Sequence, residues 1–264
     1  MICMIGLGAM GAGIASRWVA VGRQVVGLER DERRAAAWQE ESGATAWVDF
    51  DSVPWNDIHT VAIAVRLGEH VRAALEELTR HIAGRNISVF VFSTLGIQEA
   101  PAGGAVVPSG WALHEVPVSG GPQACVDGTL TVLHAGPALE PEDEALLADI
   151  SNRVYFCEEY GQPATYKLLN NCIGAFNAAT LVNMLDLARS QGVSLPTLLD
   201  IVGESSGQSW MSDNFTNFHY ELLLKDVGLL KEGGAQLPPS DLGDLASLSH
   251  RIEVARTWVR EGRS

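Results

Sequence analysis

The glycines near the N-terminus have the spacing of a dinucleotide-binding loop. They form the pattern G-x-G-x-x-G, made of Gly6, Leu7, Gly8, Ala9, Met10 and Gly11. An apolar run at residues 2–5 precedes the pattern and a helical pattern follows it, which is the strand–loop–helix context that the motif requires. Such glycines allow a tight turn and a close approach of the pyrophosphate, whose charge the helix N-terminus favours. A turn without a ligand is the weaker interpretation, because the whole βαβ context is present.

The residues that follow the second apolar run are compatible with either of two nicotinamide cofactors, NAD and NADP. Glu29 follows the run at residues 25–28 and can accept hydrogen bonds from ribose hydroxyls, which favours NAD. Arg30, followed by Arg33 and Arg34, can hold a 2′-phosphate, which favours NADP. These arginines can also be no more than the solvated start of a helix. NAD is slightly favoured because Glu29 has the more direct position.

Lysine is scarce in this chain, with only three among 264 residues against 15 arginines. A lysine whose pKa is lowered by burial and by positive neighbours can serve as a general acid or base near neutral pH. Lys167 and Asn171 are four residues apart, so on a helix they project from the same face, and Asn170 flanks them. The alternative is an exposed lysine on a polar helix face, and the scarcity of lysine argues against it.

The elements that must position these residues follow from the hydrophobic pattern. Apolar runs at 2–5, 25–28, 60–65 and 88–92 alternate with helical patterns, which predicts βαβ units and a parallel sheet. Three further strands are expected at 113–116, 129–135 and 154–156, and a loop at 101–110. A long helical pattern runs from Ala164 to about Gln191, and Pro163 suits its first turn.

We therefore expect an α/β fold, with a Rossmann-type doubly wound parallel sheet followed by an all-α domain. Residues 1–160 form the dinucleotide-binding domain in this interpretation. Residues 161–264 form an all-helical domain that begins with a long interdomain helix.

The composition excludes several classes of partner. With 18 basic and 32 acidic residues, the net charge is −14, which argues against binding to nucleic acid or to an anionic membrane. No apolar run reaches the roughly 20 residues that a membrane span needs. The four cysteines are scattered, so we expect free thiols and a cytoplasmic protein. No histidine has a ligand-like spacing, so no metal site is expected.

Three further segments occur in the order typical of one family. They are the sequence Val-Pro-Val-Ser-Gly-Gly-Pro at 116–122, Lys-Leu-Leu-Asn-Asn at 167–171, and a region from Phe218 to the Leu-Lys-Asp at 224–226. Together with the glycine loop, they closely resemble the β-hydroxyacid dehydrogenases, the group of 3-hydroxyisobutyrate dehydrogenase and tartronate semialdehyde reductase. The resemblance spans residues 1 to about 232. It extends to 6-phosphogluconate dehydrogenase, whose branch has Lys-x-x-His-Asn where this chain has Lys-Leu-Leu-Asn-Asn.

The resemblance implies roles for these residues in hydride transfer between NAD or NADP and a small β-hydroxy acid. Lys167 would be the catalytic acid/base, with Asn171 positioning it or the substrate. The substrate carboxylate would lie at Ser119, Gly120 and Gly121, where successive backbone N–H groups can form an anion-binding concavity. The remaining residues would line the substrate pocket (Asn170, Phe218, Asp226) or contact the cofactor (Ser93, Thr94, Lys225). Helical domains pair in this family, so the resemblance implies that residues 161–264 are the substrate and dimerisation domain of a homodimer or homotetramer.

The chain departs from the family pattern around the substrate cleft. The segments 94–111 and 210–218 are short, Pro163 stands where glycine is common, and the tail at 236–264 is atypical. Two alternatives therefore stay open beside the hydroxy acid. One is an imine or other carbonyl reductase, against which the presence of Lys167 argues. The other is a catalytically weak NAD(P)-binding protein.

Overall fold

The structure, a computed structural model, describes residues 1–97, 99–100, 107–216 and 220–237. Contacts divide the chain into Met1–Gly234 and Ala235–Ser264, and the following description concerns the first unit. Its first part contains β1 (Ile2–Ile5), α1 (Ala9–Ala20), β2 (Val25–Leu28), α2 (Glu32–Ser42), β3 (Ala46–Trp47), η1 (Trp55–Asp57), β4 (Thr60–Ile63), α3 (Gly68–Ile82), β5 (Ile87–Val91) and β6 (Trp111–Glu115).

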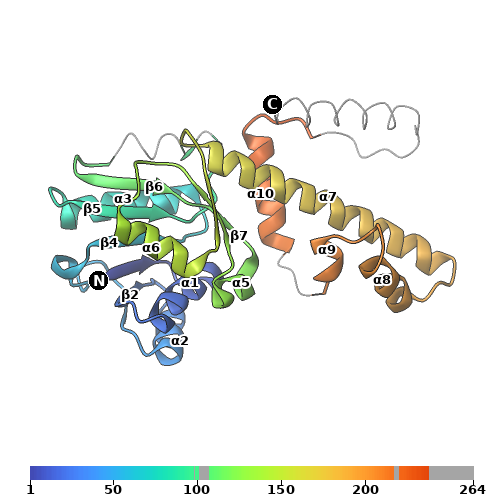
Figure 1. Ribbon diagram of the computed structural model, residues 1–264, viewed down its shortest axis with the longest axis horizontal. Helices are drawn as coiled ribbons and strands as arrows, with labels where there is room; N and C mark the ends of the chain where they lie inside the picture. The colour runs from blue at the N-terminus through green and yellow to red at the C-terminus, as the bar shows by residue number, and fades with distance from the viewer. Residues whose placement is uncertain (98, 101–106, 217–219, 238–264) are drawn as a thin grey trace. The chain divides into compact units, whose positions relative to one another are not determined.

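These strands form a six-stranded sheet in which every pair is parallel. The strand order is β3-β2-β1-β4-β5-β6 (Figure 1). In the register, Ile5 pairs with both Leu28 and Ile63. The carboxyl ends of β1, β2 and β4 therefore meet at one edge, where a doubly wound fold binds its ligands. The α/β prediction is confirmed, and the predicted strands agree with the observed ones to within two residues.

Two hydrophobic clusters hold the sheet between its helices. One cluster joins the sheet to α3, which buries an apolar stripe that includes Val71, Leu75 and Leu78. The other joins the opposite side chains of the strands to α1 through Ile14 and Trp18. Because side chains alternate along a strand, each cluster lies on its own face of the sheet.

A smaller three-stranded sheet follows the large one. It contains β7 (Val118–Ser119), β8 (Thr131–His134) and β9 (Arg153–Phe156), with α5 (Gly121–Asp127) after β7 and α6 (Pro141–Ile150) before β9. An antiparallel bridge between Glu115 and Ala135 connects it to the end of β6. The hydrophobic pattern did not predict β7 or β3, because a two-residue strand has too few positions to show an alternation.

The helical segment begins after β9. It contains α7 (Gln162–Ser190), α8 (Leu195–Gly203), α9 (Trp210–Asp213) and α10 (Tyr220–Glu232). Helix α7 agrees with the predicted long helix and has proline in its first turn. In the described part of the chain no strand follows β9, and no helix is both long and apolar enough to cross a membrane. The domain boundary at residue 160 stays a prediction.

Candidate active site

The glycine loop connects β1 to α1 at the carboxyl edge of the large sheet. Gly6 has φ 91°, and a Cβ atom there would lie 2.6 Å from the carbonyl oxygen of Ala64. A Cβ at Gly11 would lie 2.0 Å from the carbonyl oxygen of Gly6. These two glycines are therefore required by close backbone approaches inside the protein. The space around Gly8, the N-cap of α1, is open instead, so this glycine leaves room for a ligand's phosphate at the helix N-terminus.

The carboxylate of Glu29 connects the glycine loop to the start of α2. One oxygen accepts a hydrogen bond from the backbone N–H of Leu7 at 2.9 Å. The other accepts from the N–H of Asp31 at 3.0 Å and from the guanidinium of Arg34 at 2.8 Å. Burial raises the pKa of Glu29, but the hydrogen bonds from Arg34, Asp31 and Leu7 outweigh it and lower the pKa overall. Glu29 is therefore an ionised carboxylate beside the loop, and this is the charge on which the predicted preference for NAD rests.

Lys167 lies one turn into α7 and contacts β7. Its Nζ donates a hydrogen bond to the Ser119 hydroxyl at 3.2 Å, across 48 residues of sequence. Burial lowers the pKa of Lys167 to about 8; Asp226 raises this pKa and Lys225 lowers it. An amine with this pKa exchanges protons near neutral pH, as a general acid or base must.

Asn171 and Lys225 both contact the carboxylate of Asp226, and the charges of Asp226 and Lys225 act on Lys167. The amide Nδ2 of Asn171 donates to the carboxylate of Asp226 at 2.6 Å, and Lys225 Nζ lies 3.1 Å from the same carboxylate. Asp226 is only 4% exposed, so its carboxylate is available mainly to these two neighbours. Lys225 also donates to the backbone carbonyl of Arg66, in the loop after β4, at 3.4 Å. These contacts hold α7, α10 and the sheet edge together around Lys167.

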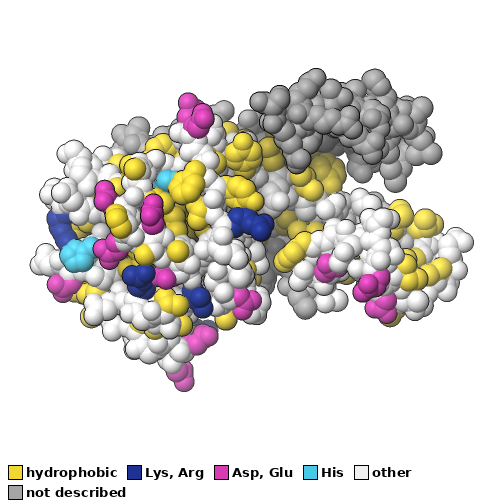
Figure 2. All heavy atoms as spheres, in the orientation of Figure 1, with side chains coloured by type: hydrophobic (Ala, Val, Ile, Leu, Met, Phe, Trp, Pro, Cys, Tyr) yellow, Lys and Arg dark blue, Asp and Glu magenta, His cyan; other side chains and the backbone are white. Residues whose placement is uncertain are grey.

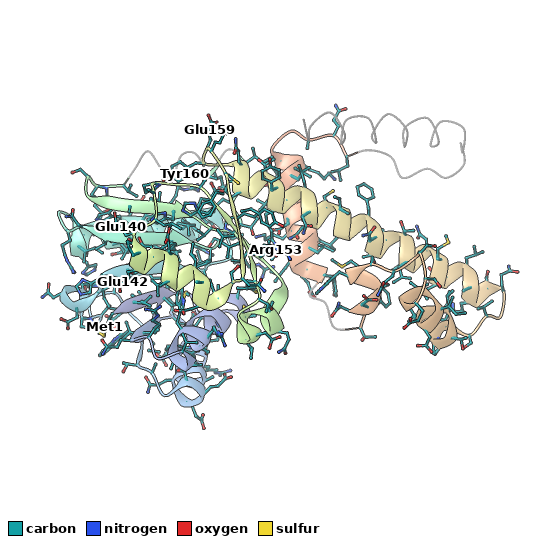
Figure 3. All side chains as sticks on the ribbon, in the orientation of Figure 1. Met1, Glu140, Glu142, Arg153, Glu159 and Tyr160 are labelled. Carbon is teal, nitrogen blue, oxygen red and sulfur yellow. The ribbon has the colours of Figure 1, made fainter. Side chains whose placement is uncertain are left out.

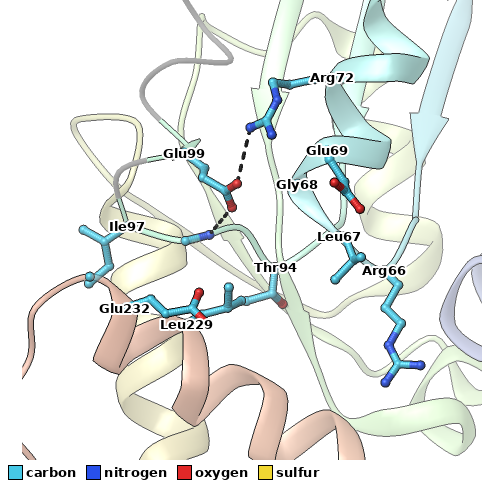
Figure 4. Close-up of a pocket in the computed structure, with 12 residues that line it drawn as sticks. Arg66, Leu67, Gly68, Glu69, Arg72, Thr94, Ile97, Glu99, Leu229 and Glu232 are labelled. Carbon is cyan, nitrogen blue, oxygen red and sulfur yellow. Dashed lines mark hydrogen bonds and ion pairs between the residues drawn. The ribbon is translucent and has the colours of Figure 1, made fainter.

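A cavity of about 450 Å³ lies beside this cluster, between the loops after β4 and β5 and the end of α10 (Figure 4). Thr94 and Arg66 line it. Glu99, on its wall, accepts from the Gly96 N–H and pairs with Arg72 at 3.3 Å. The neighbouring Ser93 is buried, and its hydroxyl accepts a hydrogen bond from the Val65 N–H at 2.9 Å, which fastens β4 to β5. Of the predicted Ser-Thr pair, Thr94 is thus the residue that borders open space.

The structure brings several of the predicted site residues together and leaves others exposed. Lys167 contacts Ser119, while Asn171 and Lys225 both contact Asp226; the charges of Asp226 and Lys225 act on Lys167 and link the two sets. Gly120 and Gly121 follow Ser119 with φ angles of 134° and 75°. Asn170 and Arg30 are exposed, although Asn170 Nδ2 donates a hydrogen bond to Asn171 Oδ1 at 3.3 Å. Phe218 lies outside the described residues. The contact of Lys225 with the backbone carbonyl of Arg66 was not predicted, because every residue type has a backbone carbonyl and the sequence cannot single one out.

Comparison with known proteins identifies the family of this chain. Residues 1–157 match the family model described as the NAD binding domain of 6-phosphogluconate dehydrogenase. Residues 161–240 match the one described as NAD-binding of NADP-dependent 3-hydroxyisobutyrate dehydrogenase. The chain belongs to the β-hydroxyacid dehydrogenase family. It is an NAD(P)-dependent oxidoreductase of this type, and the predicted family resemblance is confirmed.

Individual relatives are distant but cover most of the chain. An L-threonate dehydrogenase of Haemophilus influenzae is 26% identical over 89% of this chain and 83% of its own length. The mitochondrial 3-hydroxyisobutyrate dehydrogenase of Drosophila melanogaster is 24% identical over 95% of this chain and 82% of its own. A solved 3-hydroxyisobutyrate dehydrogenase from Salmonella typhimurium superposes with a TM-score of 0.78 at 22% identity, covering 90% of this chain and 89% of that one.

Proposed function

We propose that this chain transfers a hydride between a nicotinamide cofactor and a small β-hydroxy acid, with Lys167 as general acid/base. The observation that carries the proposal is the contact between Lys167 and Ser119, at 3.2 Å, by a lysine whose pKa is lowered to about 8. This lysine contacts the segment proposed to bind the substrate and can both accept and donate a proton near neutral pH. The same residue argues against an imine reductase.

Lys167 would carry the proton in both directions of the reaction. The nicotinamide cofactor, when bound, supplies or accepts the hydride. In oxidation, the neutral amine of Lys167 accepts the hydroxyl proton of the substrate. In reduction, the ammonium form donates a proton to the carbonyl oxygen. Asn171, whose amide is bound to Asp226, keeps its side chain on the same face of α7 as the lysine, one turn away.

The substrate carboxylate would bind at the turn formed by Ser119, Gly120 and Gly121. Both glycines have positive φ angles, a geometry in which successive N–H groups can point to one concavity. A chain with a net charge of −14 repels small carboxylates at a distance, so local positive charge must favour them. Lys167 and Lys225 supply that charge here.

We further propose that NAD is preferred over NADP. The ionised carboxylate of Glu29 stands beside the glycine loop and would repel a 2′-phosphate. We expect Glu29→Gln to reduce kcat/KM with NAD by about tenfold, the loss of roughly one charge-assisted hydrogen bond, while activity with NADP is unchanged or higher. The paired variant Arg30→Gln should leave NAD turnover unchanged. A larger loss with NADP than with NAD in Glu29→Gln would reject the preference.

The substrate assignment is tested by a panel measured at 340 nm with NAD and NADP side by side. The panel contains L-threonate, 3-hydroxyisobutyrate, further short β-hydroxy acids and a cyclic imine for the reverse direction. We expect turnover of at least one β-hydroxy acid and none of the imine. Reduction of the imine alone would support the reductase alternative. Binding of NADH without turnover of any compound would support a protein that binds the cofactor without catalysis.

The helical segment from residue 161 is proposed to form the substrate and dimerisation domain, in a homodimer or homotetramer. Helix α8 has no buried residue, and Figure 2 shows hydrophobic side chains on the surface of the α7–α8 segment. Large apolar side chains that are more than half exposed in α7, α8 and α9 include Ile173, Leu187, Ile201 and Trp210. Light scattering during gel filtration tests this assembly, and a monomer at micromolar concentration would reject it. A cytoplasmic location stays a prediction.

A further inference from the structure

Helix α7, which carries Lys167, begins without a cap from its own sequence. Its N-cap is Gly161, which has no side chain and has φ 87°, and its third residue is Ala164. In a capping box, an N-cap side chain and the third helical residue accept hydrogen bonds from each other's backbone N–H groups. Neither Gly161 nor Ala164 can accept such a bond through its side chain. The backbone N–H groups in the first turn of α7 must therefore find their hydrogen-bond acceptors elsewhere in the protein.

Glu115, the last residue of β6, supplies both missing acceptors. One carboxylate oxygen accepts from the Gly161 N–H at 2.6 Å, and the other accepts from the Ala164 N–H at 2.9 Å. The side chain is buried, at 4% exposure, and burial raises the pKa of Glu115 by more than the two hydrogen bonds lower it. Its backbone is held as well, because its N–H and carbonyl both pair with Ala135 at 2.8 and 3.0 Å. The backbone of Glu115 is therefore fixed to both sheets independently of the contacts that its side chain makes with the helix.

The same two segments meet a second time at the catalytic lysine. Lys167 follows Ala164 by three residues, about one helical turn, and Ser119 follows Glu115 by four residues. The Glu115 contacts thus fix the origin of the helix, and the next turn presents Lys167 to Ser119 at 3.2 Å. A shift of the helix start would move the lysine relative to the substrate turn.

We propose that Glu115 is a positioning residue for catalysis, which sets the place of Lys167 by capping α7 from the end of β6. This proposal rests on the proposed role of Lys167 as acid/base. Glu115 acts through the helix and not through its charge, because the charges that act on Lys167 are those of Asp226 and Lys225. Removal of the Glu115 carboxylate should therefore lower kcat without changing the pH at which Lys167 titrates.

The test uses Glu115→Gln, which keeps the size of the side chain but replaces one acceptor oxygen with a donor. We expect kcat for L-threonate or 3-hydroxyisobutyrate, whichever the wild type turns over, to fall about tenfold to a hundredfold, the usual cost of a misplaced group. The dissociation constant of NADH should stay within twofold, and the midpoint of the pH–rate profile should not move. Hydrogen exchange of residues 161–168, measured without ligand, should become at least tenfold faster.

A matched control is available in the same turn. Tyr160, beside the start of α7 in Figure 3, donates through its hydroxyl to the carbonyl of Leu113 at 2.6 Å, so it also fastens this turn to β6. Tyr160→Phe removes that bond without touching the α7 amides, and we expect its kcat to be normal. Glu115→Asp, one methylene shorter, should lie between wild type and Glu115→Gln in both exchange and kcat.

The outcomes separate this proposal from the assignment of Lys167. Faster exchange in Glu115→Gln with normal kcat would overturn the positioning role and leave the lysine's role intact. Unchanged exchange with reduced kcat would overturn the capping argument. Normal turnover by Lys167→Ala would instead reject the proposed function itself, whatever the Glu115 variants show.

Discussion

The charge of Asp226 should control the pH at which the enzyme works. The pKa of Lys167 is lowered from 10.5 to about 8, chiefly by burial, and a shift of that size corresponds to about 3 kcal/mol in favour of the neutral amine. Asp226 opposes the shift, since a nearby carboxylate stabilises the ammonium form, while Lys225 adds to it. Asp226→Asn removes the opposing charge, leaves Lys225 without its ion pair and keeps an acceptor for Asn171.

We expect the pKa of Lys167 to fall by about one unit in this variant, the lower end of the effect of a neighbouring opposite charge. At pH 7 the neutral fraction of the lysine would then rise from about 10% to about 50%, given pKa values of about 8 and about 7. Oxidation needs the neutral amine, so the rising limb of its pH profile should move to lower pH by about one unit. Reduction needs the ammonium form and should lose activity at a correspondingly lower pH.

Two assays measure this shift. The first is the pH dependence of kcat for oxidation of the best hydroxy acid. The second needs no substrate: with three lysines in the chain, the ε-carbons of ¹³C-labelled lysine give three signals, assigned with Lys225→Arg and Lys231→Arg. Glu221→Gln removes an exposed acid from the first turn of α10 and should leave the Lys167 titration unchanged. A midpoint that stays in place or rises in Asp226→Asn would refute the reasoning.

Two further predictions concern the glycine loop and the buried histidines. Gly8→Ala adds a Cβ in open space, so we expect stability to change by less than about 0.5 kcal/mol while NADH binding weakens at least tenfold. Gly11→Ala, whose Cβ would meet the Gly6 carbonyl oxygen at 2.0 Å, should destabilise the fold. Equal stability of the two variants would contradict this. His114 is fully buried beside His134, and burial lowers its pKa to about 4. Only the unfolded chain takes up this proton between pH 6.5 and 4, so stability should fall as pH falls, by at most about 3 kcal/mol. Thermal unfolding measured at pH 7 and at pH 5 should show that His114→Phe loses less stability than the wild type when the pH is lowered.

The parts of the fold that could be predicted are those with a local signature. Buried parallel strands read as short apolar runs, so β1, β2, β4 and β5 were recognisable. Helix α7 was recognisable from its length and its first-turn proline. Strands of two residues and the seven-residue helix α5 carry no such signature, and they were missed for that reason.

The candidate site was predictable only where residue type and spacing carry information. The glycine loop, Lys167 and Asn171 could be singled out from the sequence. The carboxylates that organise them could not be assigned their partners, because the contacts of Glu115 and Asp226 span about 50 residues. Such long-range hydrogen bonds depend on how the helices pack on the sheet, and no local pattern records that packing. The exposure of Asn170 depends likewise on which face of α7 is covered.

The central claim is that Lys167 moves the proton. The most direct test compares kcat of Lys167→Ala with that of Lys231→Ala, which removes an exposed lysine from the last turn of α10. Both are measured on the best hydroxy acid of the panel at saturating cofactor. We predict a loss of at least about a hundredfold for Lys167→Ala, within the usual contribution of a general acid or base, and no loss for Lys231→Ala. Turnover by Lys167→Ala within a few-fold of the wild type would contradict the account.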